Sequence, residues 1–96
     1  NSLQHAREWI SGATTNYIIY HLLKDESALL DKVNIHYLPV TNPDGYDNTW
    51  KAGNRFWRKN MRGDGRQTWG VDLNRNLPSG WGGGGSSGSK TSETYR

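Results

Sequence analysis

Several features that usually define a small domain are scarce or absent in this sequence of 96 residues. The chain contains no cysteine, which excludes a disulfide framework, a thiolate metal site and a cysteine nucleophile. No apolar run approaches the ~20 residues that a membrane-spanning helix needs, so we expect no membrane partner. The formal net charge is only +3, which is too small to indicate nucleic acid as a partner.

The hydrophobic content is also low, at 32%, and twelve residues are glycine, which buries little surface. We therefore expect a thin core to which the aromatic side chains contribute much of the buried area, including the five tryptophans. A chain of this length forms one domain at most, or part of one.

The apolar residues predict one long helix, from Glu8 to about Lys24. On one face of this helix they recur at helical spacing and form a stripe that should face the core; the stripe consists of Trp9, Ile10, Ala13, Tyr17, Tyr20 and Leu23. Other apolar side chains lie outside the stripe, which predicts that the helix is covered on more than one side, as a helix beside a sheet is; they are Ile18, Ile19 and Leu22.

Two short strands are predicted further along the chain, over residues 33–40 and 69–73. In the first segment apolar residues alternate with polar ones, which is the period of a strand with one buried face. Pro39 cannot donate to a ladder, so this strand should end or reach a sheet edge there.

The remaining segments are predicted as turns and loops. Residues 41–45 predict a tight turn, in which Pro43 sets φ at the second position and Gly45 takes a positive φ. Residues 50–67 are basic and aromatic without clear periodicity, and residues 78–89 are rich in glycine and serine. The second of these loops should be flexible and lie on the surface.

His5 and Glu8 are the first candidates for chemistry, because residues three apart lie on the same side of a helical turn. An imidazole nitrogen and a carboxylate oxygen both bind zinc, and a catalytic zinc takes three protein ligands and a water. On its own the pair is a weak signal, since a glutamate in the first turn is also typical of a solvated helix start. The other two histidines, His21 and His36, are expected on the surface or in packing.

Four elements follow one another in the chain: the His5/Glu8 pair, the turn at residues 42–45, the segment 54–59 and the segment 70–76. Together and in this order they resemble the zinc carboxypeptidases of the pancreatic carboxypeptidase A/B type. Residues 92–95 resemble the next segment of that family, so the resemblance covers essentially the whole chain.

The resemblance implies an α/β fold, in which a mixed, mostly parallel twisted β-sheet is flanked by helices. Residues 1–96 would form a partial catalytic domain, roughly its first third, with the amino-terminal strands also missing. The implied activity is that of a metallocarboxypeptidase, a zinc-dependent exopeptidase that hydrolyses the C-terminal residue of peptides. The isolated chain is expected to be inactive, because essential residues would lie outside it.

The resemblance also assigns roles to particular residues. His5 and Glu8 would bind one Zn²⁺, and the third protein ligand, a histidine, would lie outside this chain with the general-base glutamate. The zinc would polarise the scissile carbonyl and activate a water, and Arg58 would stabilise the resulting oxyanion. Asn74 and Arg75 would hold the terminal carboxylate, which suits the planar fork of a guanidinium. Arg7 would contact the substrate further from its C-terminus.

The implied partners are the C-termini of peptides or proteins and an inhibitory pro-segment, and the parent protein would be secreted. One alternative is a catalytically silent carboxypeptidase-like binding module that kept the carboxylate pocket. Another is a nucleic-acid binder that uses the basic segment 55–66 with Phe56 and Trp57, which the low net charge disfavours. The preferred terminal residue cannot be read from this sequence.

Overall fold

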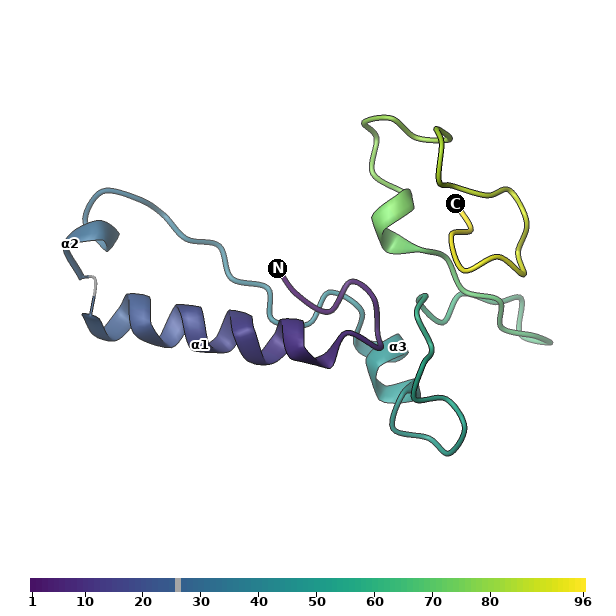
Figure 1. Cartoon of the computed structure of the whole chain (residues 1–96), viewed down its shortest axis with the longest axis horizontal. Coiled ribbons are helices and arrows are strands. Elements are labelled where there is room, and N and C mark those ends of the chain that lie inside the picture. Colours follow the sequence, from purple (N-terminus) through teal and green to yellow (C-terminus); the bar gives the residue numbers. More distant parts are fainter. Residues whose placement is uncertain (26) are drawn as a thin grey trace.

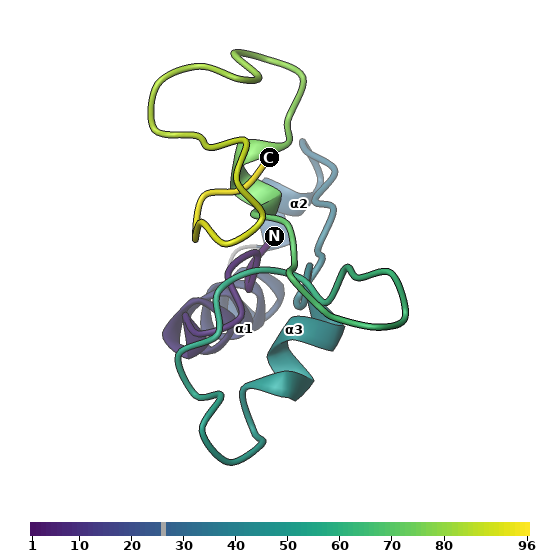
Figure 2. The ribbon, with the colours of Figure 1, turned by 90° about the vertical axis from the view of Figure 1, so that its right-hand side faces the viewer.

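The computed structural model describes residues 1–25 and 27–96. Its helices are α1 (Trp9–Asp25), α2 (Ser27–Leu30), α3 (Pro43–Asn48) and the 3-10 helix η1 (Leu73–Arg75). The molecule is elongated, 50 × 34 × 21 Å, with α1 projecting as an arm on one side and the C-terminal loops lying on the other (Figure 1). Viewed along the arm, the C-terminal loops lie above α1 and α3 (Figure 2). In the part of the chain that is described, no helix has the length and apolar character needed to cross a membrane.

The long helix is confirmed, with bounds one residue later than predicted. Its expected core-facing stripe is wrong for the described residues, because Ile10, Tyr17 and Leu23 are 76%, 66% and 66% exposed. The buried position of α1 is Gly12, and a Cβ atom there would lie 3.0 Å from the Leu3 side chain. Among the described helices only α2 packs against α1, so no layer of described helices covers the exposed part of the stripe.

Neither predicted strand is formed. Residues 33–38 and 69–72 run without regular secondary structure, and the bridges found among the described residues are isolated ones, Gly63 with Thr68 and Ser87 with Tyr95. A strand needs a neighbour to complete its ladder, and the one described backbone hydrogen bond to residues 33–38 is from Ser2 N to Leu38 O (3.2 Å), which is not a ladder. The sheet in the predicted fold class is therefore not confirmed and stays a prediction.

The predicted turn at residues 41–45 is wrong, because this segment opens helix α3. The side chain of Asn42 accepts a hydrogen bond from the Gly45 amide (3.0 Å), and Pro43 occupies the first turn, as in a regular helix start. Gly45 lies inside the helix and does not have the positive φ that was predicted for it. A Cβ atom at Gly45 would lie 2.6 Å from the Lys59 carbonyl oxygen, so glycine lets the chain around Lys59 approach the helix closely.

The buried centre lies where the amino-terminal residues, segment 57–60 and segment 70–72 meet. Backbone bonds join these segments: Ala6 N donates to Arg58 O (3.0 Å), and Asn60 N donates to Val71 O (3.1 Å). The buried side chains are mostly polar; the apolar ones are Leu3, Ala6 and Val71, and the polar or charged ones are Ser2, His5, Asn42, Asn48, Thr49, Lys59 and Asp72. Hydrogen bonding therefore organises this centre more than apolar burial does.

The tryptophans were expected in the core, but some of them lie in clusters at the surface. Trp9 stacks on Trp50 with ring centroids 4.3 Å apart, and the Arg55 guanidinium lies 3.9 Å from the centroid of Trp9. Trp50 and Trp81 are 63% and 57% exposed, so the core prediction is wrong for these two. Their rings are covered by other aromatic or arginine side chains rather than by a layer of structure.

Candidate active site

Asp72 is the centre of the site. Its side chain is fully buried, and both of its carboxylate oxygens are saturated with donors. Oδ1 accepts from His5 Nε2 (3.0 Å) and from the Asn74 backbone amide (2.9 Å). Oδ2 accepts from Nε (3.1 Å) and Nη2 (2.8 Å) of Arg58. One carboxylate therefore joins three segments that lie far apart in the sequence.

The charge of Asp72 is balanced by these donors. Burial by itself raises the pKa of the carboxyl, but the hydrogen bonds from Arg58 and His5 and the charge of Arg58 outweigh it and bring the pKa below its usual range. Asp72 is therefore ionised at neutral pH and can only accept hydrogen bonds. An ionised and buried carboxylate is tolerated only where it is paired in this way.

The ionised state of Asp72 fixes the state of His5. Since Asp72 only accepts, Nε2 of His5 must carry the proton of their shared bond, which leaves Nδ1 directed at Glu8. The distance from Nδ1 to Oε1 of Glu8 is 2.8 Å. A lone pair on Nδ1 facing a carboxylate oxygen this closely requires a cation between them, either a proton or a metal ion. The His5/Glu8 pair thus fits a zinc ion in the chemistry of its donors.

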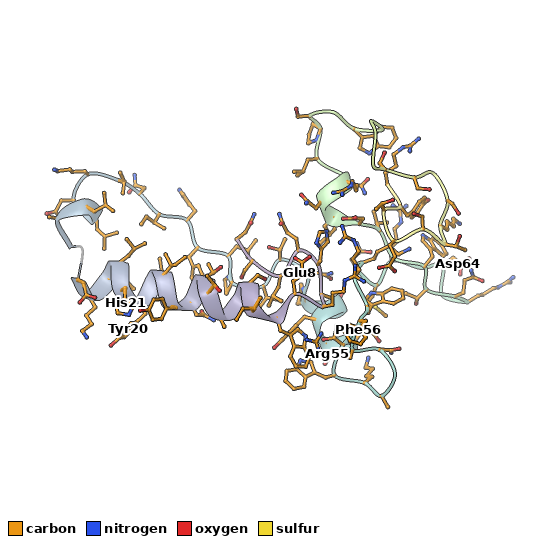
Figure 3. All side chains as sticks on the ribbon, viewed as in Figure 1. Glu8, Tyr20, His21, Arg55, Phe56 and Asp64 are labelled. Atoms are coloured by element: carbon orange, nitrogen blue, oxygen red, sulfur yellow. The ribbon has the colours of Figure 1, made fainter. Side chains whose placement is uncertain are left out.

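The pair supplies part of a zinc site only. Glu8 is half exposed, and its side chain lies where the start of α1 meets the C-terminal half of the chain (Figure 3). Over residues 1–25 and 27–96, no three or more side chains of His, Cys, Asp or Glu gather in a group that could hold a metal. This agrees with the expectation that a third protein ligand lies outside this chain.

The guanidinium of Arg58 is hydrogen-bonded along one side, and its other side has no described acceptor. Nε and Nη2 are both engaged by Asp72, and the side chain is only 12% exposed. Among the described residues, no acceptor binds Nη1. Asp72 therefore holds the cation of Arg58 in one orientation while leaving a donor for a further acceptor.

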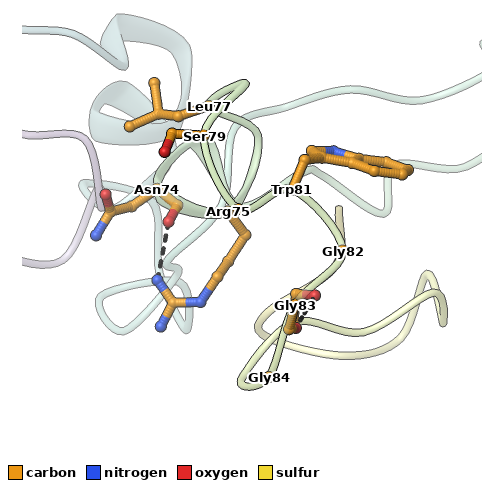
Figure 4. Close-up of a pocket in the computed structure, with 10 residues that line it drawn as sticks. Asn74, Arg75, Leu77, Ser79, Trp81, Gly82, Gly83 and Gly84 are labelled. Carbon is orange, nitrogen blue, oxygen red and sulfur yellow. Dashed lines mark hydrogen bonds between the residues drawn. The ribbon is translucent and has the colours of Figure 1, made fainter.

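The helix η1 carries Asn74 and Arg75, and Asp72 is its N-cap residue. Arg75 donates from Nε to Gly85 O (3.1 Å) and from Nη1 to Asn74 O (2.9 Å). Asn74 and Arg75 both line a cavity of about 120 Å³ beside the glycine-rich loop (Figure 4). In the described part of the chain, Nη2 of Arg75 and the side-chain amide of Asn74 have no hydrogen-bond partner, so both can receive a small anionic group.

Arg7 lies outside the Asp72 network. Its Nη1 donates to Glu93 Oε2 (2.9 Å) and to the carbonyl of Phe56 (3.3 Å). The side chain is about one-third exposed, and Figure 3 labels its neighbour Phe56 near the start of α1. The structure thus brings His5, Glu8, Arg58 and Asn74 into one network, with Arg75 beside it and Arg7 in a separate ion pair.

The other two histidines take no part in the site. His21 pairs with Asp25 along the exposed side of α1, with Nδ1 and Oδ2 2.7 Å apart, and His36 is exposed. Both lie at the surface, which is one of the two environments expected for them. Figure 3 shows His21 toward the far end of the arm from Glu8.

Sequence reasoning missed Asp72 as the centre of the site, and it also missed the neighbouring charged residues Lys59 and Glu93. Asp72 was detectable in principle, because an aspartate that closes an apolar segment and precedes a short helix is an N-cap signal. Lys59 and Glu93 lie among other charged residues and carry no such signal. Only the folded chain distinguishes them from surface charges.

Comparison with known proteins places these residues in a family. A family model described as zinc carboxypeptidase matches residues 1–96. The metallocarboxypeptidase A-like protein of Trichophyton verrucosum is 44% identical over 95 residues, which cover 96% of this chain and 22% of that protein. Zinc carboxypeptidase A 1 of Anopheles gambiae is 43% identical over 95 residues, covering 95% of this chain and 22% of that protein. The chain thus spans about a fifth of the length of these relatives.

Solved structures give the same result. Bovine thrombin-activatable fibrinolysis inhibitor, in complex with tick carboxypeptidase inhibitor, matches with a TM-score of 0.81 and 39% identity over 97% of this chain and 32% of that chain. Carboxypeptidase A from Helicoverpa armigera matches with a TM-score of 0.70 and 38% identity over 96% of this chain and 23% of that chain. These neighbours have the zinc carboxypeptidase fold, and the resemblance that the sequence motifs predicted is confirmed. With the family model matched from the first residue to the last, the chain belongs to the zinc carboxypeptidase family.

Proposed function

We propose that the whole protein containing this chain is a zinc-dependent exopeptidase that hydrolyses the bond before the C-terminal residue of peptides. Membership of the family supports a metallo-exopeptidase in general. The observation that carries the finer proposal is the Asp72 network, because one buried carboxylate fixes His5, Arg58 and the start of η1 together. These are the residues that the reaction needs in one place.

In this proposal His5 and Glu8 hold the metal, and a histidine and a general-base glutamate outside this chain complete the catalytic site. Asp72 keeps His5 in the tautomer that offers Nδ1 to a cation, and the same bond fixes the plane of the imidazole. When bound, zinc would supply Lewis acidity for the scissile carbonyl and lower the pKa of a water molecule. The isolated chain has two ligands and is proposed to be inactive.

Arg58 would stabilise the negative charge that develops on the scissile carbonyl oxygen. Its guanidinium is held by Asp72 before substrate arrives, so little reorganisation accompanies the reaction. A fixed donor aimed at developing charge lowers the barrier by about 3–4 kcal/mol in comparable sites. The open Nη1 atom is the donor available for this role.

Asn74 and Arg75 would bind the terminal carboxylate of the substrate. Both residues line a cavity beside the glycine-rich loop, and that cavity has room for a carboxylate and a few carbon atoms. Two parallel hydrogen bonds from a guanidinium select a carboxylate over a neutral amide. Arg7, at the start of α1, would contact the substrate further from its C-terminus.

Residues 1–96 are proposed to form roughly the first third of a catalytic domain whose mixed, mostly parallel sheet is completed by other parts of the protein. The family's solved structures support this architecture for the parent. Secretion and an inhibitory pro-segment are proposed by similarity to the same family. The expected partners are peptide and protein C-termini.

The test uses the product of the uninterrupted reading frame that contains this chain, called here the whole protein. We expect it to bind one zinc per molecule and to release the last residue of a blocked dipeptide, with activity lost on chelation. The same dipeptide with a C-terminal amide is the matched control, and it should be cleaved at least tenfold more slowly because Arg75 loses its carboxylate partner.

Arg75→Lys separates the role of the planar fork from that of charge, since lysine keeps the charge but not the two parallel donors. We expect the preference for the free acid over the amide to fall. Zinc binding without turnover in the unsubstituted protein would instead favour the catalytically silent binding module. Absence of both zinc and turnover would overturn the proposed function.

A further inference from the structure

Lys59 is a buried charge that the proposed reaction does not use. Its side chain is 4% exposed, and its Nζ atom donates to the carbonyls of Lys90 (2.9 Å) and Ser92 (2.8 Å). Burial lowers the pKa of the ammonium group, although the negative charges of Glu93 and Asp72 oppose that shift. A lysine is almost never this buried unless its charge is paired or hydrogen-bonded. The two carbonyl bonds satisfy the ammonium group, and the question is which part of the structure they hold in place.

These bonds tie segment 90–93 to the chain beside Arg58. Glu93 follows directly after the second carbonyl and binds Arg7, with Oε2 2.9 Å from Nη1. Two residues further on, the carbonyl of Tyr95 accepts a hydrogen bond from the Asp72 amide (2.9 Å). The segment is therefore anchored on both sides of Glu93, and Lys59 provides the anchor before it.

We propose that Lys59 is a positioning residue that acts through Glu93 on Arg7, and that it thereby sets how strongly the enzyme prefers longer substrates. The inference rests on the proposed function and extends it to residues for which that function gives no role. Lys59 fixes the backbone of segment 90–93, this backbone directs the Glu93 carboxylate, and the carboxylate holds the Arg7 guanidinium.

The physical reason is the conformational freedom of arginine. An exposed arginine side chain loses up to about 2 kcal/mol of rotamer entropy when it is ordered by a ligand. The bonds to Glu93 and to the Phe56 carbonyl order the Arg7 side chain before substrate arrives, so binding does not have to order it again. Only a substrate long enough to reach Arg7 gains from this.

The test compares a blocked dipeptide with a blocked tetrapeptide that has the same two C-terminal residues, using the whole protein. We expect Lys59→Met to lower the tetrapeptide-to-dipeptide ratio of kcat/KM about tenfold, the size associated with a charge-assisted hydrogen bond. The change should lie mostly in KM. Lys59→Arg, which keeps the charge and donors, should restore part of the ratio, and Lys51→Met, at an exposed lysine in the loop after α3, should leave it unchanged.

Glu93→Gln tests the same route without altering a buried residue, since the Glu93 side chain is 58% exposed. This substitution should lower the tetrapeptide-to-dipeptide ratio by a similar factor. The double variant Lys59→Met/Glu93→Gln should have a ratio only slightly lower than either single variant, because both changes act on Arg7. If Lys59→Met does not fold, the ratios of Glu93→Gln and Lys59→Arg decide the question.

Three results would overturn this inference while leaving the proposed function intact. One is an equal fall in kcat/KM for both substrates, which indicates a general structural role for Lys59. The others are an unchanged ratio in Glu93→Gln and additive effects in the double variant. If the unsubstituted protein cleaves neither substrate, the proposed function fails and the inference falls with it.

Discussion

The Nε2 atom of His5 lies 3.0 Å from Oδ1 of Asp72, a contact between residues 67 positions apart in the chain. It joins the proposed metal pair at the start of α1 to the short helix that carries Asn74 and Arg75. The same carboxylate holds Arg58 through its other oxygen. The residues proposed for metal binding, oxyanion stabilisation and carboxylate binding are thus connected through one buried side chain, which makes Asp72 the most informative position to change.

Replacing Asp72 by asparagine should affect stability and metal affinity together. Asparagine keeps the shape but leaves the buried Arg58 without its counter-charge, and breaking a buried ion pair in this way costs about 3–5 kcal/mol. Zinc affinity should fall about 10–100-fold, because His5 loses its outer partner. Urea unfolding and zinc titration of the whole protein measure the two effects.

Asp47→Asn is the matched control for that change. Asp47 is 75% exposed and pairs only with Lys51 at the surface, at 3.3 Å. Its substitution should alter stability by less than about 0.5 kcal/mol. Equal and small losses in both variants would mean that the Asp72 network contributes nothing beyond an ordinary surface charge.

Glu8→Gln should weaken zinc binding without unfolding the protein. The Glu8 side chain is half exposed, and its one described side-chain partner is His5. A neutral amide is a poor replacement for a carboxylate ligand, so we expect the zinc content after dialysis to fall well below one per molecule. Asp25→Asn, on the exposed end of α1, is the control, and unchanged zinc content in Glu8→Gln would contradict the assignment of Glu8.

The turn at residues 64–67 should respond to pH through Asp64 (Figure 3). The backbone amides of Gln67 and Arg66 donate to its carboxylate at 3.1 and 3.0 Å, and these bonds lower the pKa of Asp64 below its usual range. A lowered carboxyl pKa stabilises the turn fully above the pKa of the unfolded chain, and this contribution is lost as pH falls through the folded pKa.

Amide chemical shifts of Arg66 and Gln67, followed by NMR from pH 7 down to pH 2, measure this response. Both amides should shift together, with a midpoint below the ordinary range of an aspartate. Asp64→Asn keeps an acceptor oxygen but cannot titrate, so its amides should stay constant. A midpoint at or above the ordinary range would show that the bonds do not hold the carboxylate.

The sequence was sufficient for the long helix, because its apolar period and its length leave little choice of structure. It was also sufficient for the family, since four motifs in a fixed order carry more information than any one of them. The strand prediction failed for residues 33–38, whose alternation of side chains is real but whose backbone forms no ladder with another described segment. An alternating pattern describes one strand, but a ladder forms only where a second strand lies beside it.

The predicted turn at Pro43 failed for a different reason. Proline and glycine suit a turn, but Asn42 and Pro43 are equally typical of a helix start, and the capping bond from the Gly45 amide favoured the helix. At the site, residue types and spacing gave candidates for contact with metal and substrate, and these roles stay predictions. They could not identify Asp72 or Lys59, whose roles depend on contacts between distant segments.

The isolated chain of 96 residues should not unfold cooperatively. Among the described residues three apolar ones are buried, Leu3, Ala6 and Val71, while large apolar side chains on α1 and beyond remain exposed, among them Ile10, Tyr17 and Leu23. Apolar burial is the main favourable contribution to folding, and the polar centre of this chain cannot replace it, because a hydrogen bond contributes only about 1 kcal/mol net.

We therefore expect far-UV circular dichroism and tryptophan fluorescence of the isolated chain to change gradually with urea, at different midpoints, even at low micromolar concentration. The whole protein should give coincident sigmoidal transitions, because two-state unfolding requires a core that is lost at once. Coincident and steep transitions in the isolated chain would mean that its hydrogen-bonded centre is stable by itself. In that case α1 would not need a covering layer, and its exposed stripe would have to be explained as a binding surface.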